Sequence, residues 1–155
     1  MWGRKRSRRD DEEWAQLLPT GAHEAGHAIA FRASGARVTG MSVGGWGGVT
    51  RTTGEPAPDN ARGMEGFAVA VLAGQEAEIS YLQRHHGYSR GRALRETAHG
   101  ASSDMREFRG YSSASGLSEA EARRRARALV RHHRGRIDRL AERVSERGEL
   151  GGWSI

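Results

Sequence analysis

The stretch that decides the fold covers residues 19–35 and reads PTGAHEAGHAIAFRASG. Pro19 at its start and Gly35 at its end are typical of the first turn and the terminator of an α-helix. Between them, apolar residues recur at spacings of three and four, which predicts a helix with one face against a core. The apolar stripe consists of Ala22, Ala25, Ile29 and Ala33.

Two histidines and a glutamate lie beside this stripe in the pattern His-Glu-x-x-His. His23 and His27 are four residues apart, so a helix turns both imidazoles toward one side, where two nitrogens can hold one zinc ion. Glu24 projects next to them and is placed to take a proton from a zinc-bound water. The alternative is a pair of surface histidines on an amphipathic helix. The helical context favours the zinc site.

A catalytic zinc site needs a third protein ligand and keeps its fourth position for water. Glu78 falls on the apolar face of a later predicted helix, where a carboxylate is costly unless something pairs with it. Asp104 lies in the first turn of a predicted short helix, where a carboxylate can cap backbone amides without any metal. Spacing alone does not decide between these two acids. The other downstream candidates are His85, His86 and His99.

The residues after the zinc motif predict a small β-hairpin followed by a long helix. Two short strands, 37–43 and 49–53, flank a glycine-rich turn. The helix is capped by Asp59 or Asn60 and runs to about residue 86, where Gly87 ends it.

The second half of the chain predicts further helices. Residues 87–100 read as a polar loop and residues 102–108 as a short helix. Ser118 and Glu121 form a capping box that opens a last helix, and Gly135 is placed to kink it. The predicted fold class is therefore mainly α with one small β-hairpin.

The composition limits how such a fold is stabilised. The chain has 155 residues, a net charge of +6, and 23 residues of Leu, Ile, Val and Phe, about 15% of the total. That fraction is below the ~20% at which charged chains tend toward disorder, so a deep aliphatic core is not expected. Cysteine is absent, which excludes disulfides, thiolate-ligated zinc and thiol catalysis. A core this small needs a further source of stability, and the zinc site is the candidate.

We expect two regions along the chain. Residues 1–12 carry a basic cluster followed by an acidic one and predict a disordered tail, with an arm that binds nucleic acid or a partner as the alternative. Residues 13–155 predict one domain. No apolar run approaches the ~20 residues of a membrane helix, so a cytoplasmic protein without membrane contact is expected. The arginines are spread along the chain without a nucleic-acid motif, which makes nucleic acid an unfavoured partner.

The chain resembles the peptidase domain of the FtsH proteases, which are membrane-anchored ATP-dependent zinc proteases. Five segments carry the resemblance in the family's order, over about residues 15–152. They are the zinc helix His23-Glu24-Ala25-Gly26-His27-Ala28, the strand pair Val38–Arg51, the segment Val71-Leu72-Ala73-Gly74-Gln75-Glu76-Ala77-Glu78, the signature Gly100-Ala101-Ser102-Ser103-Asp104, and the closing segment from Arg136 to Leu150.

The resemblance implies a zincin-like peptidase fold, with Asp104 as the third zinc ligand and Glu78 as an acid that orients a ligating imidazole. Two departures from the family stand out. Gly45-Trp46-Gly47 replaces the family's Pro-Arg-Gly between the strands, and neither an ATPase P-loop nor a transmembrane segment is recognisable. The resemblance also implies a homo-oligomeric ring, although in the family the ATPase module helps to build it.

These features predict a zinc-dependent endopeptidase. A zinc-bound water would attack a peptide carbonyl with Glu24 as general base, and an edge of the hairpin Val38–Thr53 would hold the extended polypeptide substrate. The substrates would be flexible or unfolded polypeptides, cleaved without ATP unless a separate unfoldase delivers them. The alternative is a non-catalytic binding module with the peptidase fold, an adaptor or regulator of a full-length protease.

Overall fold

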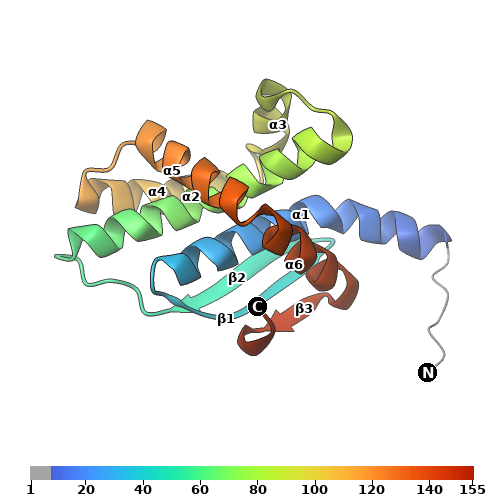
Figure 1. The fold of residues 1–155 in the computed structure, drawn as a ribbon, viewed down its shortest axis with the longest axis horizontal. Coiled ribbons are helices and arrows are strands. Elements are labelled where there is room, and N and C mark those ends of the chain that lie inside the picture. Colours follow the sequence, from blue (N-terminus) through green and yellow to red (C-terminus); the bar gives the residue numbers. More distant parts are fainter. Residues whose placement is uncertain (1–7) are drawn as a thin grey trace.

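The computed structural model describes residues 8–155. Helices predominate, and three short strands form one antiparallel sheet in the order β2-β1-β3. The helix α1 lies between this sheet and α2, and the remaining helices pack against these two (Figure 1). The elements are α1 (Arg8–Ala33), β1 (Arg37–Gly44), β2 (Gly47–Thr53), α2 (Ala61–His86), α3 (Arg90–Thr97), α4 (Ser102–Ser115), α5 (Glu119–His132), α6 (Arg134–Arg147), β3 (Glu149–Gly151) and the 3₁₀ turn η1 (Gly152–Ser154).

The sheet confirms the predicted hairpin and extends it. β1 and β2 pair in antiparallel register from Arg37 opposite Thr53 to Gly44 opposite Gly47. β3 pairs with the other side of β1, through Leu150 opposite Met41. The strand β3 was not predicted, because three residues are too few for an alternating pattern to be recognised. Among the described strands, β2 is consequently at the edge of the sheet.

The first helix begins eleven residues earlier than predicted. Pro19 lies inside α1 and not in its first turn, and residues 8–12, expected to belong to a disordered tail, are helical. Acidic residues in the first turn suit the positive end of the helix dipole. Trp14 and Leu18 pack against a small cluster that includes Tyr81, and this burial offsets the cost of a proline within the helix. The basic residues 4–6 lie outside the described residues.

The helix α2 has the predicted ends. Asn60 caps it by accepting a hydrogen bond from the amide of Gly63 at 2.9 Å, and Gly87 ends it in the left-handed conformation with φ of 65°. The predicted polar loop after it is wrong, since Ser89 caps the helix α3. This helix buries only Ala93 and Thr97, so its sequence lacks the apolar stripe that would have indicated it.

The C-terminal helices also differ from the prediction. The short helix expected over residues 102–108 continues to Ser115 as α4. Ser118 caps α5 as predicted, by accepting a bond from the amide of Glu121. The single last helix is in fact two, because the chain breaks at His133, two residues before the predicted kink at Gly135.

The core is built largely from small residues. Alanines with no exposed surface lie where α1, α2 and α5 meet, which lets the helix axes approach closely. At Gly26, an added Cβ would lie 2.6 Å from the Cβ of Ala77, so glycine is required at the crossing of α1 and α2. Close helix packing thus replaces bulky aliphatic side chains. No helix among residues 8–155 is both long enough and apolar enough to cross a membrane.

Candidate metal centre

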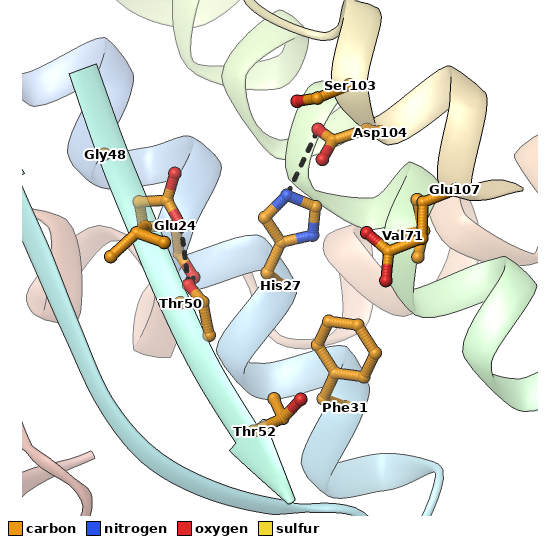
Figure 2. A pocket seen from close by; sticks show the side chains of 11 residues that line it. Glu24, His27, Phe31, Gly48, Thr50, Thr52, Val71, Ser103, Asp104 and Glu107 are labelled. Carbon is orange, nitrogen blue, oxygen red and sulfur yellow. Dashed lines mark hydrogen bonds and ion pairs between the residues drawn. The ribbon is translucent and has the colours of Figure 1, made fainter. Parts of the chain in front are cut away.

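Three side chains from two helices converge on one point. His23 and His27 come from the middle of α1, and Asp104 comes from the first turn of α4. Oδ2 of Asp104 lies 2.9 Å from Nε2 of His23 and 3.2 Å from Nε2 of His27. The two Nε2 atoms are 3.0 Å apart. Figure 2 shows His27 pointing from α1 toward Asp104.

Each imidazole is held through its other nitrogen. Nδ1 of His27 donates to the carbonyl oxygen of Ala70 at 3.0 Å. Nδ1 of His23 lies 2.9 Å from Oε2 of Glu78. In neutral imidazoles these bonds keep the proton on Nδ1, so both Nε2 lone pairs point at the place where the Asp104 carboxylate also points.

The electrostatics of the group favour a positive charge between its three atoms. Burial opposes protonation of His23, but hydrogen bonds to Asp104 and Glu78 outweigh it and raise the pKa of His23 to about 10. The pKa of His27 is also raised, because the bond to Asp104 overcomes burial. Burial disfavours the charge on Asp104, yet its bonds to the two imidazoles hold the pKa of that carboxyl well below its usual range.

The arrangement fits the requirements of a metal ion. His23, His27 and Asp104 are a set of side chains that could hold one, with ligand atoms within 4.8 Å of one another. Ligands of a tetrahedral ion at ~2.0–2.2 Å lie about 3.3–3.6 Å apart, so the observed triangle of 2.9, 3.0 and 3.2 Å would need to open by only a few tenths of an ångström. Two imidazole nitrogens and one carboxylate oxygen are donors that zinc accepts.

The two acids left open by spacing have separate places. Asp104 belongs to the converging group, whereas Glu78 contacts the far nitrogen of His23 and is not part of that group. The remaining candidate histidines lie outside it as well. His85 and His86 are exposed at the end of α2, and His99 is exposed between α3 and α4.

Glu24 lies next to the centre on the side of the sheet. Its side chain is buried, and the hydroxyl of Thr50 on β2 donates to Oε2 of Glu24 at 2.6 Å (Figure 2). Gly48 makes room for this carboxylate, because an added Cβ would lie 2.7 Å from Oε1 of Glu24. The carboxylate is therefore clamped between α1 and β2.

A cavity of about 220 Å³ joins the carboxylate to the centre. Glu24, His27 and Asp104 line it together, so a small group within it can contact all three. Its other walls come from α1, β2, α2 and α4 and include Phe31, Thr50, Val71 and Glu107 (Figure 2).

Sequence reasoning missed the residues that position the site without touching its centre. Thr50 was only one residue of a predicted strand. Gly74 on α2 faces the ring of His27, and a Cβ there would overlap the imidazole, coming within 2.5 Å of Cε1. A glycine inside a predicted helix is the one signal that could have indicated such a close approach.

Comparison with known proteins adds no family assignment. No protein-family model matches the chain, and no curated protein matches it.

Proposed function

We propose that the chain is a zinc-dependent metalloendopeptidase with a zincin-like site related to that of the FtsH peptidases. The observation that carries the proposal is the convergence of Nε2 of His23, Nε2 of His27 and Oδ2 of Asp104, with the Glu24 carboxylate in the same cavity. A structural metal site has no need of a clamped acid beside it. A hydrolytic site does.

Different residues of the chain would bind the metal, transfer the proton and orient the imidazoles. His23, His27 and Asp104 would hold the ion, which supplies a Lewis acid that polarises a peptide carbonyl and makes water easier to deprotonate. Thr50 fixes Oε2 of Glu24, which leaves Oε1 to accept the proton from the attacking water and pass it to the leaving amine. Glu78 and the carbonyl of Ala70 keep both imidazoles in the orientation that binding requires.

The substrates we propose are flexible or unfolded polypeptides. In the part of the chain that the structure describes, β2 pairs with β1 on one side only, and its residues Gly48, Val49 and Thr50 line the cavity at the centre. An extended peptide that adds to the other side of β2 would run past Glu24 and His27. Backbone pairing reads little sequence, so we propose broad specificity, with a separate unfoldase needed only for folded substrates.

The same donor set also occurs in non-haem iron sites, which use two histidines and a carboxylate. Glu24 distinguishes the two, because a buried carboxylate fixed beside the centre serves proton transfer in hydrolysis. Reconstitution of metal-free protein with Zn²⁺ and with Fe²⁺ separates them. We expect cleavage of casein with Zn²⁺.

The decisive test replaces the proposed base. Glu24→Gln keeps the size and the bond from Thr50 but cannot accept the proton, so it should bind one zinc ion and lose casein cleavage by about 100-fold or more. Glu96→Gln is the matched control, since it makes the same change on the exposed side of α3. A Glu24→Gln protein that cleaves like the parent would contradict the mechanism. Zinc-loaded parent protein without any cleavage would favour the non-catalytic binding module.

A further inference from the structure

A second cavity, of about 340 Å³, shares no residue with the metal centre. It lies among α2, α3, α5 and α6, and its lining is strongly basic. Five arginines and a single carboxylate line it: Arg84, Arg90, Arg127, Arg131, Arg134 and Glu76. A hollow lined by one sign of charge raises the local concentration of ions of the opposite sign.

Two of these arginines are fixed in place by acids. Arg90 makes two bonds of 2.9 Å to the carboxylate of Glu76, whose side chain is 1% exposed. Arg84 makes two bonds of 2.8 Å to Asp138 on α6. Both pairs are bidentate, which orients the guanidinium planes. The walls of the cavity are therefore held in place by the fold.

The other three arginines pair with no acid among the residues that the structure describes. Across residues 8–155, no ion pair or side-chain hydrogen bond engages Arg127, Arg131 or Arg134. Arg127 and Arg131 are four residues apart on α5, so they project from the same side of that helix. Arg134 opens α6, whose first turn contains no acidic residue. The cavity thus keeps three positive charges that no acid within residues 8–155 pairs with.

We propose that this cavity binds a small phosphate-bearing anion with two or more negative charges, such as inorganic phosphate, pyrophosphate or the phosphate groups of a nucleotide. Guanidinium groups match the geometry of phosphate oxygens and bind them bidentately, whereas lysine acts as a point charge. The three unpaired guanidinium groups carry three positive charges, whereas a monocarboxylate supplies only one negative charge. The volume is at the small end of the range for small-molecule pockets, which suits a compact anion better than an extended polymer.

The test measures binding of sodium pyrophosphate to the full chain by calorimetry, at constant ionic strength set with sodium chloride. The variant Arg127→Gln/Arg131→Gln removes two free guanidiniums from exposed positions on α5. We expect it to weaken pyrophosphate binding by about tenfold or more. The control Arg109→Gln/Arg139→Gln changes two exposed helical arginines outside the cavity and should bind like the parent. Melting curves of all three proteins verify that each is folded.

Further titrations distinguish which phosphate compound the cavity binds. Inorganic phosphate, pyrophosphate and ATP are titrated in turn, and the tightest binder identifies the number of phosphate groups that the cavity accepts. Equal pyrophosphate affinity in all three proteins, or no pyrophosphate binding to the parent, would overturn the proposal. An oligonucleotide that binds the parent and is released by Arg127→Gln/Arg131→Gln, without any pyrophosphate binding, would overturn it in favour of a nucleic-acid surface.

Discussion

The substitution Gly74→Ala should weaken metal binding about 100-fold or more although it replaces none of the proposed ligands. A methyl group at residue 74 would overlap the ring of His27 and come within 2.7 Å of Cδ2. The helix backbone of α2 cannot retreat, because it packs between α1 and α5. The imidazole must therefore move, which takes Nε2 away from His23 and Asp104 and breaks the bond to Ala70.

The size of the effect can be worked out from these contacts. Loss of the bond to Ala70 costs about 0.5–1.5 kcal/mol, and overpacking costs about 1–3 kcal/mol. Alanine gains about 1 kcal/mol over glycine in a helix. Metal-free Gly74→Ala should thus lose about 0.5–3.5 kcal/mol in its free energy of unfolding. Removal of a partner that only orients a ligand costs 10–100-fold in metal affinity, so displacement of a ligand should cost about 100-fold or more.

Zinc affinity is measured by competition with a chromogenic chelator, and unfolding by urea titration of the metal-free proteins. Gly110→Ala is the control, because a Cβ at this position of α4 meets nothing within 4 Å. It should bind zinc like the parent and gain about 0.5–1 kcal/mol in stability. A Gly74→Ala protein with the zinc affinity and activity of the parent would refute the geometry described for His27.

Three further predictions concern the groups around the centre. Thr50→Val removes the bond to Glu24 and should lower kcat for casein about tenfold or more at unchanged zinc content, while Thr50→Ser, which keeps the hydroxyl, should retain most activity; equal rates would show that the bond is dispensable. Glu78→Gln weakens the hold on His23 and should reduce zinc affinity about tenfold in the chelator assay, and an unchanged affinity would contradict that role. Free zinc at 100 times its Kd should stabilise the folded protein by about 2.7 kcal/mol. Removal of that zinc with EDTA should therefore lower Tm by about 5–11 °C. An unchanged melting curve would contradict the prediction that zinc binding stabilises the fold.

The parts of the fold that were predictable are those whose signals are local. The cap at Asn60, the terminator Gly87 and the hairpin around the glycine-rich turn each follow from the conformations that one or two residues prefer. The helix that carries His23 and His27 was recognised from its apolar spacing, although its start was not. Pro19 misled the prediction because packing of Leu18, which no local rule reveals, stabilises the helix on both sides of the proline.

The elements that were missed depend on distant contacts. α3 turns only Ala93 and Thr97 inward, and Thr97 is held there by a bond from Gln75 on α2. β3 exists because Leu150 lies opposite Met41 on a strand more than a hundred residues earlier. Neither partner can be inferred from the segment itself.

The site also combines features that local sequence predicts with features that depend on distant contacts. The histidine spacing indicated which two imidazoles face one side of α1. The spacing left Asp104 and Glu78 both open, the family resemblance favoured Asp104, and the arrangement of α4 and α2 around α1 gives the two acids their separate contacts with His23. Both acids contact His23, one on each ring nitrogen, which is why either was a reasonable ligand from the sequence. The clamp on Glu24 by Thr50 joins α1 to β2 and is likewise a tertiary feature.

The low content of large aliphatic residues has a structural counterpart in the alanine-rich helix crossings. Ala25, Ala28 and Ala73 have no exposed surface, and contacts of this kind depend on close approach more than on side-chain volume. Substitution of a larger residue at such a crossing is expected to be more harmful than in a core of leucines. The zinc site would add a further tie between α1 and α4.

The measurement that tests the central claim most directly is a crystal structure of the zinc-loaded protein with an anomalous map at the zinc edge. We predict one peak at ~2.0–2.2 Å from Nε2 of His23, Nε2 of His27 and a carboxylate oxygen of Asp104, with Glu24 beside it and not bound to it. A peak at another place, or one ligated by Glu78 in place of Asp104, would contradict the account.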